Sequence, residues 1–166
     1  VDAGTHEKIS TGRKHDKFGI AYEEAPGLYR LAASLKGVNP LGVHLHIGSQ
    51  IGRLEPFAAA YRRAVDLFTS LRADGIPLQR LDLGGGLGVP YFDEPDPPSP
   101  AEYAAMVSRV FDGLDIGLSF EPGRMIAANA GVLLSRVVRL QERPLPIVVL
   151  DAAMNDLIRP AIYDAY

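Results

Sequence analysis

Leu41-Gly42-Val43-His44-Leu45-His46-Ile47 is the stretch that decides the fold. Its aliphatic residues alternate with Gly42, His44 and His46, so a strand would carry the aliphatic side chains on one face and both histidines on the other. Apolar runs at residues 18–20, 78–83 and 116–120 are also typical of short buried strands, and amphipathic segments lie between them. Repeated strand-helix units with apolar strands predict a parallel sheet covered by helices, in the α/β class.

Two of the intervening segments carry helix signals. Pro56 follows Glu55 where a first-turn proline is tolerated, and apolar residues then recur at helical spacing as far as Leu71. Ser99-Pro100-Ala101-Glu102 fits a capping box at the start of a second helix. Residues 91–98, rich in Pro and Asp, are predicted to form a loop.

Beyond Arg124 the pattern changes to longer apolar runs at 132–140 and 146–150, with a turn predicted at 141–144. We therefore expect a partial barrel domain over residues 1–130 and the beginning of a β-rich domain over residues 131–166. An eightfold barrel needs roughly 250 residues, so four strand-helix units amount to half of one. The first residue is Val1 rather than Met, and we expect the chain to be an internal piece.

The composition excludes several classes of protein. With 47% hydrophobic residues and a net charge of −3 over 166 residues, the chain is an ordinary globular sequence without a membrane span. Its basic residues are scattered, which argues against a nucleic-acid partner. The sequence has no cysteine, so a disulfide or a thiolate metal site within it is excluded, and a reducing compartment such as the cytoplasm is compatible.

His46 is the first candidate for binding. In a barrel, both histidines of the strand would point inward, with His46 nearer the C-terminal mouth, where active sites of barrels lie. There it could lie flat against a planar ring. The alternative, a pair of polar core histidines, stays open and is stronger for His44; a metal site is less favoured, because no third His or Cys ligand is near.

Gly84-Gly85-Gly86-Leu87-Gly88 directly follows a predicted strand, so its amides could surround an anion such as a phosphate. It does not match the dinucleotide fingerprint, because Val89 occupies the third glycine position, and it lacks the Gly-Lys-Ser/Thr of a Walker loop. A tight turn without a ligand remains the alternative.

Glu121-Pro122-Gly123-Arg124 combines an anion, a turn and a forked cation at the end of a predicted strand. A carboxylate facing a pyridine nitrogen favours the protonated ring, and the arginine can bind phosphate or carboxylate. The alternative is a surface turn with an ion pair. Later in the chain, Arg159 and Tyr163 are one helical turn apart and could hold a substrate carboxylate, unless the arginine only stacks on a tyrosine.

Together these motifs resemble the alanine-racemase-like family of pyridoxal-phosphate enzymes, over essentially the whole chain. The similarity is carried by His-Ile-Gly-Ser-Gln at 46–50, the glycine run at 84–88, Glu-Pro-Gly-Arg at 121–124 and Asn-Asp-Leu-Ile-Arg-Pro-Ala-Ile-Tyr at 155–163. Residues 9–12 and 17–19 also look like this family. The resemblance implies the second half of a (β/α)8 TIM barrel that binds pyridoxal 5'-phosphate, followed by a C-terminal β domain.

The resemblance also implies roles for individual residues. His46 would stack on the pyridine ring and Glu121 would meet its nitrogen, while the phosphate would be bound by Ser49, Gly85, Gly86, Gly123 and Arg124. Arg124, Arg159 and Tyr163 would contact the amino-acid substrate. The last segment is similar to that of decarboxylases that act on meso-2,6-diaminopimelate and release L-lysine and CO2; ornithine or arginine as substrate, or a non-catalytic barrel that only binds the cofactor, are the alternatives.

The chain departs from the family at two catalytic groups. The family attaches its cofactor through a lysine on the first barrel strand and receives a cysteine across a dimer interface, and both lie outside this chain. None of its four lysines, Lys8, Lys14, Lys17 and Lys36, is a credible replacement. We therefore expect no catalytic residue within the chain, an inactive isolated fragment and a homodimeric parent.

Overall fold

The computed structural model describes residues 18–91 and 95–163. Their centre is a parallel sheet in the order β1 (Gly42–His44), β2 (Arg80–Asp82) and β3 (Gly117–Ser119). Val43, Leu81 and Leu118 lie side by side in its register. Helix α2 (Glu55–Ala73) connects β1 to β2, and α3 (Pro100–Val110) connects β2 to β3, which confirms the predicted alternation of strands and helices.

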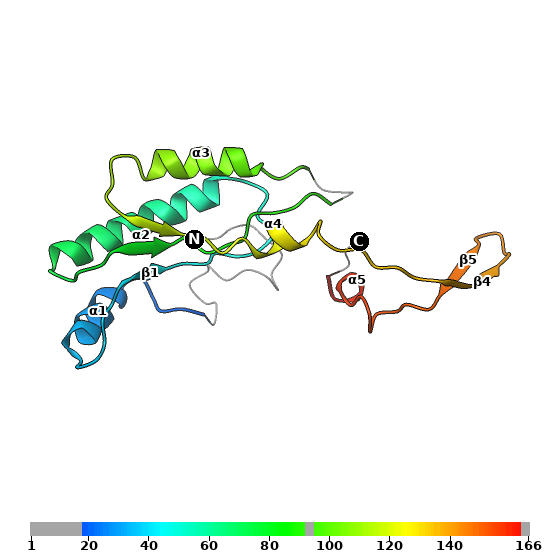
Figure 1. The fold of residues 1–166 in the computed structure, drawn as a ribbon, viewed down its shortest axis with the longest axis horizontal. Coiled ribbons are helices and arrows are strands. Elements are labelled where there is room, and N and C mark those ends of the chain that lie inside the picture. The colour runs from blue at the N-terminus through cyan, green and yellow to red at the C-terminus, as the bar shows by residue number, and fades with distance from the viewer. Residues whose placement is uncertain (1–17, 92–94, 164–166) are drawn as a thin grey trace.

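Helices α2 and α3 lie together on one side of the sheet (Figure 1). Phe57, Phe68 and Leu71 of α2 are almost completely buried, and so is Leu81 of the central strand. Tyr61 is buried among them, and its hydroxyl lies 2.6 Å from that of Tyr103 in α3. Burial raises the pKa of both tyrosines, so these two hydroxyls stay protonated and form a hydrogen bond between the helices.

The helix signals in the sequence are confirmed. Helix α2 begins at Glu55 with a proline in its first turn. At the start of α3, the Glu102 amide donates to the Ser99 hydroxyl while the Glu102 carboxylate accepts from the Ser99 amide, so both halves of the capping box are present. Helix α1 (Ala25–Ser34) joins the sheet through Tyr29, whose hydroxyl donates to the Gly42 carbonyl at 2.6 Å.

The prediction of a strand at residues 18–20 is wrong. Phe18 and Gly19 form a bend and Ile20 is in no strand, because Gly19 has a φ of 76°, which is incompatible with an extended strand. The three strands of the sheet are also shorter than their apolar runs. One further hydrogen bond extends each strand pair, from the Leu45 amide to the Asp82 carbonyl and from the Leu83 amide to the Ser119 carbonyl. Beyond these bonds the strands diverge into loops.

After β3 the chain forms the short helix α4 (Gly123–Ala127), the antiparallel hairpin β4 (Val137–Gln141) and β5 (Ile147–Leu150), and helix α5 (Arg159–Tyr163). β4 begins at Val137 instead of residue 132, because strand pairing with β5 starts only there. The hairpin projects away from the sheet and its helices (Figure 1). Within the described ranges, no helix is long and apolar enough to cross a membrane.

Candidate functional site

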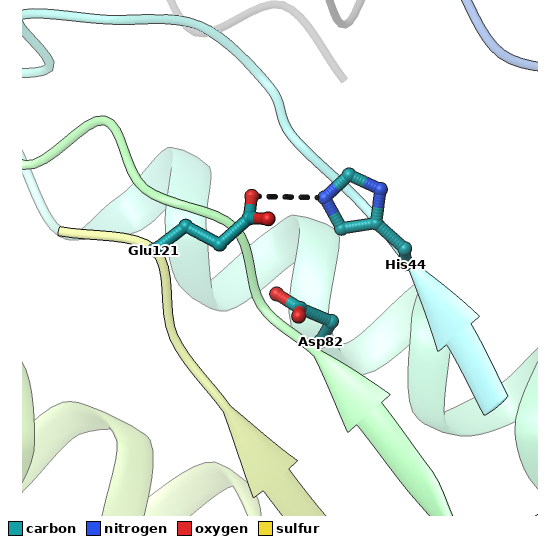
Figure 2. Close-up of side chains that lie close together, drawn as sticks. All are labelled: His44, Asp82 and Glu121. Atoms are coloured by element: carbon teal, nitrogen blue, oxygen red, sulfur yellow. Dashed lines mark hydrogen bonds and ion pairs between the residues drawn. The ribbon is translucent and has the colours of Figure 1, made fainter. Parts of the chain in front are cut away.

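The candidate site lies where the three parallel strands end. His44 is the last residue of β1, Asp82 is the last residue of β2, and Glu121 follows β3. Figure 2 shows their side chains pointing toward one another. His44 Nε2 lies 3.1 Å from Glu121 Oε2, although the two residues are 77 positions apart in the sequence. The parallel sheet therefore brings an imidazole and two carboxylates together at one edge.

These three side chains are close enough to bind one cation together, since their ligand atoms lie within 4.8 Å of one another. Two of them, His44 and Glu121, are more than half exposed, and Asp82 Oδ1 already accepts a hydrogen bond from the Gly84 amide at 2.9 Å. Exposed acidic groups often lie this close without a metal ion, so the distances alone do not define a metal centre.

His46 lies beyond the end of β1, on the same side as His44. Its Nδ1 is 3.3 Å from the Gly85 amide and accepts that hydrogen bond, which places the proton of a neutral ring on Nε2. The ring is exposed. Gly85 thus connects the loops that follow β1 and β2, and His46 is oriented by a backbone amide rather than buried in the core.

The glycine loop after β2 has no room for side chains. A Cβ on Gly84, Gly85 or Gly86 would collide with the carbonyl oxygen of Leu45, Glu121 or Gly48, respectively. Gly84 and Gly86 also have φ values of 65° and 104°, which favour glycine. The loop is therefore packed backbone to backbone between the loops that follow β1 and β3.

Two of its amides are engaged within the site, Gly84 with Asp82 and Gly85 with His46. A role of Gly85 and Gly86 in binding an anion stays a prediction. The turn at Gly123 is tied to the same loop, since the Glu121 amide donates to the Gly84 carbonyl at 2.9 Å and the Gly123 amide to the Glu121 carbonyl at 2.8 Å.

Arg124, in α4, is held by two neutral hydroxyls. Its Nη2 donates to Ser49 Oγ at 3.1 Å and its Nη1 to the Tyr91 hydroxyl at 3.0 Å. Its Nε is buried and, among the described residues, has no hydrogen-bond partner. Glu121 pairs instead with His44. The carboxylate and the guanidinium of the tetrapeptide are thus engaged separately, and do not form the surface ion pair considered as an alternative.

Arg159 begins helix α5, and Tyr163 ends it, so the two residues are indeed one helical turn apart. The Arg159 guanidinium carbon lies 4.3 Å from the centroid of the Tyr91 ring. The arginine does stack on a tyrosine, but on the one that also binds Arg124. This contact connects the region after β5 to the loop after β2.

Sequence reasoning missed three residues of the site. Asp82 alternates with Leu81 and Leu83, and this pattern could have placed it on the face of His44. Gln50 exchanges two hydrogen bonds with the Val89 backbone, at 2.6 and 3.2 Å, and so joins the loops after β1 and β2. Tyr91 stands at the start of a loop, where no pattern indicates its two contacts.

The arrangement fits a planar ligand that carries an anion and a basic ring nitrogen. Arg124 offers a buried donor that has no hydrogen-bond partner among the described residues, and Glu121 offers an exposed carboxylate for the nitrogen. Lys36, the lysine within the described ranges, lies in the turn before β1, whereas the site lies at the C-terminal ends of the strands. It cannot serve as an amine for this site.

The sequence profile described as "Pyridoxal-dependent decarboxylase, pyridoxal binding domain" matches residues 1–128. The chain is 51% identical over 168 residues to diaminopimelate decarboxylase of Zymomonas mobilis and 52% identical over 167 residues to that of Pseudomonas fluorescens. In each case all of this chain is covered but only 40% of the relative, so the chain spans about two fifths of these proteins.

The structure is similar to that of diaminopimelate decarboxylase from Helicobacter pylori complexed with L-lysine. The TM-score is 0.93 with 39% sequence identity, and the match covers 99% of this chain and 41% of that one. The similarity therefore extends over nearly the whole chain.

Proposed function

This chain belongs to the family of pyridoxal-dependent decarboxylases, and from that premise we propose that it is part of an enzyme that converts meso-2,6-diaminopimelate to L-lysine and CO2. The observation that carries the proposal is the convergence of His46, the glycine loop and Glu121 to Arg124 at the ends of the three strands. The identity of 51–52% to named diaminopimelate decarboxylases supports the choice of substrate.

We assign the cofactor contacts by position in this site. Glu121 would hold a proton at the ring nitrogen, and His46, fixed by the Gly85 amide, would lie against the ring. Ser49, Gly86 and Arg124 would bind the phosphate, together with Gly85 and Gly123, whose amides would have to turn from the acceptors they have in this structure, His46 Nδ1 and the Glu121 carbonyl. Pyridoxal phosphate, when bound, supplies an acceptor for the electrons released with CO2.

The carboxylate of Glu121 is itself oriented by the rest of the chain. His44 binds one of its oxygens, and the backbone of Glu121 is fixed on both sides by Gly84 and Gly123. Such contacts leave the second carboxylate oxygen for a ligand and limit its movement. Arg124, Arg159 and Tyr163 would contact the substrate and orient its distal carboxylate, which is not released as CO2.

We further propose that residues 1–130 form part of a (β/α)8 barrel and that residues 131–166 begin a β-rich domain. The change from a parallel sheet to an antiparallel hairpin supports this boundary. The apolar side chains of the hairpin are exposed, with Val138 at 62% and Leu140 at 65%, as expected of strands that belong to a larger sheet. A homodimer remains a proposal that light scattering of the complete protein would test.

The proposal is tested on the longer protein that we infer contains this chain. We expect it to release CO2 from meso-2,6-diaminopimelate and far less from L-ornithine or L-arginine, and to require added pyridoxal phosphate after dialysis. Arg159→Ala should raise the KM for the substrate with a distal carboxylate. Equal CO2 release from all three amino acids would contradict the proposed substrate preference. No release from any of them would contradict the proposed decarboxylase activity.

The isolated 166-residue chain should not turn over, because no lysine in its described part reaches the site. Its CO2 release in the presence of cofactor is compared with that of a Glu121→Ala variant as the control. Release above this control would show that the chain supplies its own amine, contrary to our reading.

A further inference from the structure

Tyr91 is the side chain at which the two candidate substrate arginines meet. Its hydroxyl accepts from Arg124 Nη1 at 3.0 Å, and its ring lies under the Arg159 guanidinium at 4.3 Å. Arg124 comes from α4 and Arg159 from α5. One tyrosine thus contacts two guanidinium groups that are distant in the sequence.

The contacts of Tyr91 orient Arg124 without neutralising it. A carboxylate partner would hold the guanidinium more strongly but would also compensate its charge. In the described part of the chain, the hydrogen-bond partners of Arg124 are the hydroxyls of Tyr91 and Ser49, which are neutral. The buried Nε adds a donor that has no acceptor among residues 18–91 and 95–163. The cation is therefore fixed in place with its charge available to a ligand.

We propose, on the basis of the function above, that Tyr91 is a positioning residue that holds Arg124 and Arg159 around a ligand oxyanion. Its hydroxyl acts on Arg124 and its ring on Arg159, so the two effects can be separated by substitution. The oxyanion is either the carboxylate of the amino-acid substrate or the phosphate of the cofactor, and the binding experiments below distinguish the two.

The test uses the complete protein and two pairs of probes. L-Lysine and cadaverine share two amino groups but only L-lysine has a carboxylate; pyridoxal phosphate and pyridoxal differ by the phosphate. Tyr91→Phe should weaken binding of the carboxylate or the phosphate probe by about 10-fold, the usual cost of a lost hydrogen bond to a charged group. The matching probe without the anion should bind as it does to the wild type.

Tyr91→Leu also removes the ring and should cost a further ~2- to 5-fold for the anionic probe, as expected for an exposed cation–π contact. In a background of Arg124→Ala, Tyr91→Phe should have no additional effect, because the hydroxyl acts through that arginine. If Tyr91→Leu does not fold, the phenylalanine variant and this double variant still decide the question.

Tyr22→Phe is the matched control. Tyr22 also stacks under an arginine, at 4.7 Å from Arg63, and its hydroxyl also makes a hydrogen bond, to the Arg63 carbonyl, but it lies away from the site. It should leave all four affinities unchanged. Anionic and neutral probes weakened equally by Tyr91→Phe, or no weakening at all, would overturn the role of Tyr91. A wild-type protein that binds none of the probes would overturn the proposed function and this inference together.

Discussion

Gly85→Ala should damage the site by forcing two loops apart. A Cβ at this position would collide with the Glu121 carbonyl oxygen, which already accepts from the Gly123 amide at 2.8 Å. The oxygen cannot retreat freely, because the Glu121 amide is bound to Gly84 at 2.9 Å. The backbone after β3 must therefore move, and with it the carboxylate that we place at the ring nitrogen.

The magnitude follows from two opposing terms. Forcing extra atoms into a packed region costs about 1–3 kcal/mol. Replacing glycine by alanine restricts the unfolded chain, and where the conformation allows it this returns roughly 0.4–1 kcal/mol. We expect a net loss of about 1–2 kcal/mol in the free energy of unfolding, measured by urea denaturation with far-UV circular dichroism.

Gly52→Ala provides the matched control, since a Cβ there has nothing within 4 Å and the residue has no positive φ. It should be neutral or slightly stabilising. If about 1.4 kcal/mol of the strain is present in the ligand-bound form and absent from the free form, the affinity of Gly85→Ala for pyridoxal phosphate should fall by about 10-fold. Two variants with equal stability and equal affinity would refute the reasoning.

Three further predictions concern the scaffold, and each is checked by urea denaturation of the variant beside the wild type. Leu81→Ala, at a fully buried position of the central strand, should cost about 2–5 kcal/mol, and a loss below ~1 kcal/mol would mean that the helices do not pack on this strand. Tyr61→Phe should cost about 1 kcal/mol, because the hydroxyl of Tyr103 loses its partner; an unchanged midpoint would show that the hydroxyl pair contributes nothing. Hydrogen bonds from Ser99 hold the pKa of Glu102 below its ordinary value of 4.5, so Glu102 contributes stability that is fully present above pH 4.5 and lost as the pH falls through the lowered pKa. Glu102→Gln should accordingly be less stable than the wild type at pH 7 and equal to it at pH 2, and a difference that persists in acid would exclude this linkage.

Local signals in the sequence predicted the helices well. The capping box at Ser99 and the proline after Glu55 are short-range features whose hydrogen bonds form within one turn, so they do not depend on the rest of the fold. The alternation around His44 and His46 was confirmed for β1, which ends at His44, whereas His46 lies beyond the strand. By contrast, residues 18–20 have an apolar run but no strand, because the backbone of Gly19 turns there.

The site was predictable only in part, for a similar reason. His46, Glu121 and Arg124 belong to contiguous motifs, and the sheet does bring these motifs together. Tyr91 and Gln50 act through partners 33 and 39 residues away, and nothing in their immediate neighbours specifies those partners. Asp82 was overlooked although its position between two leucines carried the information.

The candidate site joins positions that are far apart along the chain, such as His44 with Glu121 and Ser49 with Arg124, separated by 77 and 75 residues. A ligand that bridges the ends of three strands binds only when all three are assembled, so it binds the folded chain and not the unfolded one. At a hundred times its dissociation constant, such a ligand adds about 2.7 kcal/mol to the free energy of unfolding. The lifetime of this protein against proteolysis should consequently rise and fall with the supply of its cofactor.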